Sequence, residues 1–164
     1  MAIETTRIEG LANVLDTLKR LPPEIVSKRG GPVRAALNKS ARMMQKQVIA
    51  NLDAVIAHGN AGGDEQSTGL LRKNIVVTRI KRKQNGEAYS VRVRNKAYPK
   101  LSENAKRFTT AQNARLLEYG TEKRQPYPFI RPAFEAKKAE AVQVFTDELN
   151  KRLAVIIRKL DKDR

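Results

Sequence analysis

Apolar residues recur at helical spacing in two long segments of the chain. In the first segment, from Pro32, they step by threes and fours while most Lys and Arg residues fall elsewhere, so the segment predicts a helix with one buried stripe and one basic face. The second segment begins near Pro132, a residue suited to the first turn of a helix. The apolar positions are Val33, Leu37, Ala41, Met44, Val48, Leu52 and Val55 in the first segment and Phe134, Ala141, Val142, Phe145, Leu149, Leu153, Ile156 and Leu160 in the second.

The chain before Pro32 predicts smaller elements. Residues 3–8 have the composition of a short strand, and residues 11–18 carry leucines and a valine at helical spacing until Pro22 and Pro23 end the run. Arg29-Gly30-Gly31 predicts a hinge, because paired glycines are poor helix formers. The sequence therefore predicts an N-terminal helical pair.

A β-hairpin is predicted between the helical segments. Residues 75–83 and 88–94 are rich in β-branched residues, and Asn85-Gly86 between them is the pair preferred in two-residue hairpin turns. On the second arm, Tyr89, Val91 and Val93 alternate with polar and basic residues, which predicts one buried face and one basic face. Residues 111–119 predict a short helix that runs into a strand.

These elements predict one α+β domain spanning residues 1–164. We expect a small, mainly antiparallel sheet with a β-hairpin, packed against the N-terminal helical pair and the long C-terminal helix. Two polar stretches, near residues 58–68 and 96–110, predict flexible loops, and the charged end at 158–164 predicts a frayed tail. At 164 residues, the chain is long enough to bury a core without a disulfide or a metal.

The charge of the chain indicates its partners. It has 33 Lys and Arg against 17 Asp and Glu, a formal net charge of +16. Such a surface attracts polyanions or acidic proteins. Only 5% of the residues are aromatic and none is Trp, which argues against a base-stacking platform for single-stranded nucleic acid. The N-terminus lacks a signal pattern and no apolar run is long enough to cross a bilayer, so we expect the chain to be made and kept in the cytoplasm, without membrane contact, until it is assembled.

Candidate catalytic chemistry is sparse. The chain has no Cys, and His58 is the only His, so zinc clusters, cysteine nucleophiles and most His-based catalysis are excluded. His58 lies at the edge of a glycine-rich segment without a nucleophile at a recognisable spacing, and Asp64 and Glu65 are adjacent carboxylates without a second cluster. The glycines near 62 and 69 match no phosphate-binding loop. We expect no enzyme activity, no metal and no cofactor.

The hairpin motivates one binding hypothesis. Basic residues line both arms and would contact a phosphate backbone as a β-ribbon does. The alternative is a solvated hairpin that is basic because the whole chain is. The candidate polyanion contacts are Arg79, Lys81, Arg82, Lys83, Arg92 and Arg94.

A distinctive pattern precedes the C-terminal helix. Leu117-Glu118-Tyr119-Gly120-Thr121 is followed by Pro126-Tyr127-Pro128-Phe129-Ile130-Arg131-Pro132-Ala133-Phe134, and upstream stands Ser67-Thr68-Gly69-Leu70-Leu71-Arg72-Lys73-Asn74-Ile75. These three elements resemble the phage tail-component family typified by the tenth gene product of a lambda-like coliphage. Residues 96–114 depart from that family, whose members often have a shorter segment there.

The resemblance implies a structural virion protein of a tailed phage. It would act in tail completion or head-tail joining, at the neck, as a ring that is typically hexameric and sits at the head-proximal end of the tail. Tail-terminator and stopper roles share such subunits and stay open. Its partners would be copies of itself, other tail and head-tail connector proteins, and the phage DNA that passes through the channel.

Physical arguments give the matched residues a role in assembly. Gly120 would allow a backbone conformation closed to other residues, and the prolines would pre-order a segment that docks on a neighbour. Arg131 would pair with Glu118 or with an acidic residue of the next subunit. We expect Phe134 to pack within the subunit, and leave both arrangements open for Phe129. The interface candidates are Glu118, Tyr119, Gly120, Thr121, Pro126, Pro128, Phe129, Arg131, Pro132 and Phe134.

A rival hypothesis is a basic protein that binds duplex DNA directly through the 75–94 hairpin. It is motivated by the net charge of +16 and by the arginine alternation on the second arm. It predicts tight binding with a steep dependence on salt. An enzyme ranks behind both hypotheses because no nucleophile, base or metal cluster is found.

Overall fold

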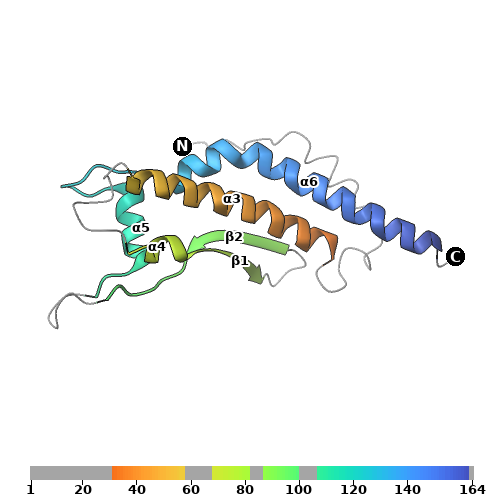
Figure 1. Ribbon diagram of the computed structural model, residues 1–164, viewed down its shortest axis with the longest axis horizontal. Coiled ribbons are helices and arrows are strands. Elements are labelled where there is room, and N and C mark those ends of the chain that lie inside the picture. Colours follow the sequence, from red (N-terminus) through yellow and green to blue (C-terminus); the bar gives the residue numbers. More distant parts are fainter. Residues whose placement is uncertain (1–30, 58–67, 82–86, 100–106, 163–164) are drawn as a thin grey trace, which may run out of the picture.

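The computed structural model describes residues 31–57, 68–81, 87–99 and 107–162. The elements, labelled as in Figure 1, are α3 (Pro32–Ala57), α4 (Leu70–Lys73), β1 (Ile75–Lys81), β2 (Glu87–Val93), α5 (Thr110–Tyr119) and α6 (Ile130–Lys162). The expected α+β class is confirmed, with an antiparallel hairpin and a long C-terminal helix. The strand expected at residues 3–8, the helix at 11–18 and the hinge at 29–31 lie largely or wholly outside the described residues.

The α3 helix is the central layer of the fold. Figure 1 shows the hairpin on one side of α3 and α6 on the other, and α3 contacts both. The apolar positions predicted for α3 form a single stripe, whereas the hairpin and α6 pack against two different sides of the helix. The helix therefore joins the sheet to the C-terminal helix.

The hairpin is confirmed, but its register differs from the predicted one. A two-residue turn at Asn85-Gly86 would place Lys81 opposite Ser90. Instead, Lys81 is opposite Glu87 and Thr78 is opposite Ser90, a register about three positions away from the one that this turn would give. The side of the sheet with Ile75, Val91 and Val93 packs into the core, because successive side chains of a strand point to opposite faces. The buried face predicted for the second arm is confirmed.

The main core gathers residues from almost every element. Val48 and Leu52 of α3 meet Leu71, Ile75, Ala114, Leu117, Phe129 and Ala133. Phe129 is the largest of the fully buried side chains, with no exposed surface. Burial of one such aromatic side chain contributes on the order of 2 kcal/mol, so this cluster holds α5, the chain after it and α6 against α3.

A second cluster holds the rest of α6 against α3. Ala36 packs against Leu149 and Leu153, so the two helices run antiparallel. Beside this cluster, the Ser40 hydroxyl donates to the Ala141 carbonyl at 2.7 Å. The predicted apolar stripe of α6 is therefore correct at these two leucines.

An ion-paired carboxylate reinforces this contact. Glu148 accepts from Lys39 Nζ of α3 at 2.7 Å and from Arg152 Nε at 2.6 Å. The hydrogen bond from Lys39, then that from Arg152, lowers the pKa of Glu148 against the effect of burial. The pair links α3 to α6 only while Glu148 is ionised.

The α5 helix begins with a capping box. The Thr109 hydroxyl accepts from the Gln112 N–H, and the Gln112 side chain accepts from the Thr109 N–H. The expected helix is confirmed, but the strand expected after it is wrong: Gly120 ends α5 and no regular strand follows in the described residues.

The ends of the predicted 96–110 loop are tied together. The Tyr98 N–H donates to the Phe108 carbonyl at 2.9 Å, and their rings stack with centroids 5.8 Å apart. Residues 100–106 and the other predicted loop, except Thr68, lie outside the described residues. The helix α6 continues to Lys162, through most of the tail predicted to fray. The mobility of both loops, the fraying and the single domain stay predictions.

Candidate functional site

The segment that carries the family resemblance forms a compact joint, residues 118–131, between α5 and α6. The chain turns at Gly120, which has φ +72°, a region that side-chain residues rarely adopt. A Cβ atom there would lie 2.7 Å from the Arg124 carbonyl oxygen and 2.9 Å from the Pro126 nitrogen. The conformational role predicted for Gly120 is therefore confirmed.

Backbone hydrogen bonds fix the chain after Gly120. Thr121 and Arg124 exchange N–H to carbonyl bonds around a tight turn, at 2.9 and 3.2 Å. The Tyr127 N–H then donates to the Leu117 carbonyl at 2.7 Å, which holds the proline-rich segment against α5. The segment is thus packed within its own subunit.

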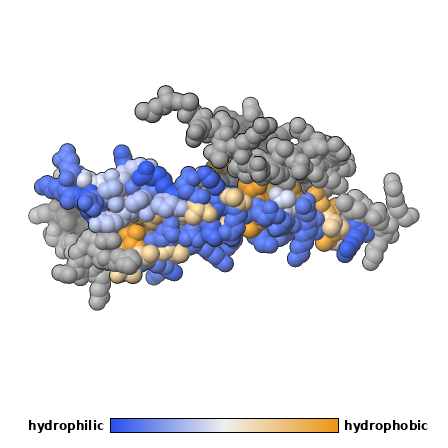
Figure 2. All heavy atoms as spheres, turned by 90° about the horizontal axis from the view of Figure 1, so that it is seen from above, coloured by the Kyte–Doolittle hydropathy of each residue, from blue (hydrophilic) through white to orange (hydrophobic). Residues whose placement is uncertain are grey.

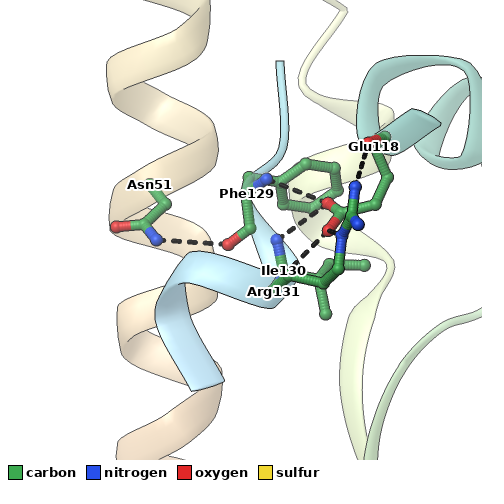
Figure 3. A network of polar contacts seen from close by, with 5 residues as sticks. All are labelled: Asn51, Glu118, Phe129, Ile130 and Arg131. Carbon is green, nitrogen blue, oxygen red and sulfur yellow. Dashed lines mark hydrogen bonds and ion pairs between the residues drawn. The ribbon is translucent and has the colours of Figure 1, made fainter. Parts of the chain in front are cut away.

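Glu118 of α5 caps the N-terminus of α6 (Figure 3). Its carboxylate accepts from the backbone N–H groups of Phe129, Ile130 and Arg131, each at 2.9 Å. These are three of the first four N–H positions of α6, which have no partner inside the helix. The fourth position is Pro132, which has no N–H. One carboxylate therefore satisfies the whole end of the helix.

The charge of Glu118 is held by the joint. Its side chain is almost fully buried, and burial alone would raise the pKa. The hydrogen bonds from Ile130, Arg131 and Phe129 outweigh burial and hold the pKa of Glu118 below its usual value. The positive end of the α6 dipole favours the same ionised form.

Arg131 completes the pair predicted with Glu118. Its Nε lies 3.2 Å from Glu118 Oε1, and its Nη2 donates to the Glu118 backbone carbonyl at 3.1 Å. The guanidinium carbon lies 5.0 Å from the centroid of the Tyr119 ring. Arg131 is thus fixed by three contacts although its side chain is 61% exposed.

Phe129 fills the space between the joint and α3. It has no exposed surface, and its backbone carbonyl accepts from the Asn51 side-chain amide at 3.2 Å (Figure 3). Both contacts are made inside the subunit. In this conformation Phe129 is a core residue and not an exposed anchor.

The environment of Phe134 differs from the one predicted from the sequence. Its side chain was expected to pack within the subunit, but it is 54% exposed. The buried neighbour is Ala133, which takes the position that faces the core. The internal packing predicted for Phe134 is therefore wrong.

The ten interface candidates thus divide into two groups. Glu118 and Phe129 are buried, and Gly120 is half-buried. The others are exposed: Tyr119, Thr121, Pro126, Pro128, Arg131, Pro132 and Phe134. Among these, Tyr119, Arg131 and Phe134 form what we call the aromatic-arginine face, because Arg131 lies over Tyr119 and Phe134 follows one helical turn later. Their role in assembly stays a prediction.

The basic residues of the hairpin are not gathered on one face. Arg79 is opposite Tyr89, on the side of α3, where the Tyr89 hydroxyl accepts from Arg34. Arg92 is opposite Val76, on the other side, with its Nε 3.1 Å from the Thr78 hydroxyl.

Arg79 is also ion-paired. Its guanidinium donates to both Glu87 carboxylate oxygens, at 2.7 and 2.5 Å, which lowers the pKa of Glu87. Arg94 is exposed just beyond β2, and Lys81 is the last residue of β1. Arg82 and Lys83 lie outside the described residues. The contact with a polyanion stays a prediction, and Arg79 lies on the other side of the sheet from Arg92.

The described residues show few features of a chemical site. In that part of the chain, no three His, Asp or Glu residues come together as ligands for a metal ion. None of the described helices is long and apolar enough to span a bilayer. A shallow hollow beside the aromatic-arginine face is lined by Arg115, Leu116, Tyr119 and Gly120.

Comparison with protein families decides the family of this chain. Residues 12–120 match the HK97-gp10-like family, described as "Bacteriophage HK97-gp10, putative tail-component". The chain belongs to this family. The match covers more than half of the sequence and confirms the family resemblance, and it ends at Gly120, before the proline-rich segment and α6. No curated protein and no solved structure matches the chain.

Membership of the HK97-gp10-like family sets the broad role of the protein. The family is one of phage tail components, so the chain has a structural role in the tail, is located in the virion and contacts other tail proteins. A structural role agrees with the absence of enzyme activity expected from sequence, which stays a prediction.

The roles of Glu118 and Asn51 were not predicted from the sequence. Glu118 was considered only as a partner for Arg131, because nothing in the spacing shows that its carboxylate reaches three N–H groups more than ten residues away. Pro132 was the only sequence signal for this cap that we identify. It marks the first turn of a helix, and the N–H groups of that turn need an acceptor from outside the helix. Asn51, which contacts Phe129 from α3, carries no sequence signal.

Proposed function

We propose that this protein is a tail-completion or head-tail joining component that assembles as a hexameric ring at the head-proximal end of the tail. The observation that carries the proposal is the family match over residues 12–120. The geometry supports it, because the matched segment leads into a rigid joint that leaves an exposed aromatic-arginine face. The neighbours of the ring are other tail and head-tail connector proteins, with phage DNA passing through the channel.

Rigidity favours such a role. The joint is fixed by backbone hydrogen bonds, by a glycine that no other residue replaces without strain, and by a fully buried Phe129. A surface that is already ordered loses little conformational entropy when it docks. A subunit with this joint keeps one shape as it enters an assembly.

Direct DNA binding by the hairpin is the weaker alternative. Its described cations lie on different sides of the sheet, and Arg79 is ion-paired with Glu87. A single contact surface for a phosphate backbone would need these charges on one side. The charge of +16 then serves to attract acidic partners or the DNA in the channel.

The test is the mass of the purified protein, measured by light scattering at low and moderate salt, with and without duplex DNA. We expect a discrete ring-sized species that forms without DNA and whose fraction increases with protein concentration. A protein that stays monomeric at every concentration and shifts in mass only when DNA is added would contradict the ring and favour the DNA-binding alternative.

A further inference from the structure

The aromatic-arginine face combines the residue types that dominate protein interfaces. Tyr119 is 65% exposed and Phe134 is 54% exposed, with Arg131 between them. Arg131 lies over the Tyr119 ring, and Phe134 follows Arg131 one helical turn later. Single exposed apolar residues are normal on a protein surface, whereas Tyr, Phe and Arg are enriched at interfaces. Seen from above the view of Figure 1, the described surface is mostly hydrophilic with apolar patches between (Figure 2).

Arg131 is held in one conformation and keeps N–H donors for a further acceptor. Of the five N–H groups of its guanidinium, Nε and one on Nη2 are used by Glu118, and the other three have no acceptor among the described residues. The contact with Glu118 and the Tyr119 ring already fix the side chain. A partner carboxylate would therefore find a planar donor whose conformation costs little to hold.

The local charge selects the chemistry of the partner. Residues 115–138 contain six Lys and Arg against three Glu. One of the three, Glu118, is buried on the N-terminus of α6. Two of the cations are also paired, Lys138 with Glu135 at 2.6 Å and Lys137 with Glu140 at 2.5 Å. The exposed surface of this segment is therefore positive, and it disfavours contact with the same segment of a second copy.

The hollow beside the face suits an apolar side chain. It is lined by Leu116, Gly120 and the Tyr119 ring, with Arg115 at its edge. An apolar side chain seated there would lie beside Arg115, which lines the hollow, and beside the Tyr119 ring, over which Arg131 lies. Carboxylates flanking that side chain would meet both arginines.

We infer that the aromatic-arginine face is the docking surface for an acidic segment of another virion protein, one that presents an apolar side chain flanked by Asp or Glu. The inference rests on the proposed function, since the neighbour is sought among virion proteins. It adds which surface is used and what the neighbour presents.

The experiment places the photoreactive amino acid benzoyl-phenylalanine at position 134 of the full-length, affinity-tagged protein. Cells producing the phage are irradiated, and the crosslinked peptide is sequenced by mass spectrometry. The exposed Phe134 tolerates the larger ring, and an unchanged melting temperature confirms it. We expect an adduct with a net-negative peptide of a different phage protein.

Charge reversal gives the matched comparison. Arg115→Glu and Arg131→Glu, each on the crosslinking background, should lower the adduct yield about tenfold or more, because each replaces an attraction by a repulsion. Lys151→Glu, at an exposed position far along α6, should change it by less than about twofold. Among the described residues, the Arg115 side chain makes no hydrogen bond or ion pair with the joint, so it separates binding from folding if Arg131→Glu unfolds the protein.

The outcomes separate this inference from the proposed function. An adduct mainly with a second copy, with DNA or with a basic peptide would overturn the inference, as would the absence of any adduct. If the protein is present in purified particles without an acidic adduct, the docking surface is wrong and the tail role stands. If the acidic adduct forms but the protein is absent from finished particles, the docking surface stands and the proposed function fails.

Discussion

Two phenylalanines five residues apart in the same motif have opposite environments. Phe129 is fully buried against α3, whereas Phe134 is exposed on the first turns of α6. Their neighbours in sequence give no reason for the difference. It arises because the helix begins at Ile130 and turns Ala133, not Phe134, toward the core.

Truncating each phenylalanine should therefore have a different result. Phe129→Ala leaves a cavity in the main core and should lower the free energy of unfolding by about 3–5 kcal/mol. Phe134→Ala removes an exposed ring and should change it by less than about 0.5 kcal/mol. Urea denaturation of both variants measures the two values, and equal losses would contradict the described packing.

Two glycines with positive φ, Gly69 with ψ of 1° and Gly120 with ψ of −169°, provide a second comparison. Gly69 and Gly120 have φ of +66° and +72°, but a Cβ at Gly69 meets nothing within 4 Å. Gly69→Ala should cost only the conformational strain, about 1 kcal/mol. Gly120→Ala adds a clash with backbone atoms of Arg124 and Pro126 and should cost at least about 2 kcal/mol. Thermal unfolding with both variants in parallel would refute the account if Gly69→Ala were the more damaging.

At the scale of elements, the N-terminus of α6 depends on α5. Most helices are capped by a side chain next to the helix start, but here the cap comes from Glu118, near the end of the preceding helix. The joint therefore couples the position of α5 to the formation of α6. The stability that the cap contributes varies with pH because the acceptor is the carboxylate of Glu118.

The pH dependence has a definite sign. The pKa of Glu118 is lowered in the folded protein, so its contribution is complete above the ordinary glutamate pKa of about 4.3 and is lost as the pH falls through the lower folded-state value. Glu118→Gln should cost about 2 kcal/mol at neutral pH. The difference from wild type should shrink in acid, where the wild-type carboxyl is itself protonated.

Denaturant unfolding from neutral to acidic pH measures this effect. Glu135→Gln is the control, an exposed glutamate paired only with Lys138, and should change stability by less than about 0.5 kcal/mol. A Glu118→Gln difference that stays constant across the whole pH range would show that the charge of Glu118 is not what caps α6.

Elements were more predictable from sequence than contacts between them. The helices α3 and α6 follow from the spacing of Val48, Leu52, Leu149 and Leu153, because a helix that packs on a core must present one apolar side. The register of the hairpin did not follow from Asn85-Gly86, since tertiary packing of Ile75 and Val93 overrides a local turn preference.

The candidate site was predictable only in part. Gly120 and the Glu118–Arg131 pair followed from residue chemistry and the family resemblance. The cap on three N–H groups and the contact of Asn51 with Phe129 depend on how α5 and α3 approach α6, which no local pattern encodes.

At the scale of the whole molecule, α3 links the hairpin to the C-terminal helix α6. One side carries the hairpin and the other carries α6 (Figure 1). The joint between α5 and α6 carries the aromatic-arginine face, with Tyr119 from α5 and Arg131 and Phe134 from α6. The arrangement places an ordered, positively charged surface on a subunit of a phage tail. Association with acidic neighbours then gains from charge as well as from apolar contact.

The most direct test of the tail role is deletion of the gene in the phage or prophage that carries it, followed by electron microscopy and titration of infectious particles. The account predicts filled heads and tails that fail to join or complete, a titre at least about a hundredfold lower, and recovery when the wild-type protein is supplied from a plasmid. Complete, infectious particles that lack the protein would contradict it.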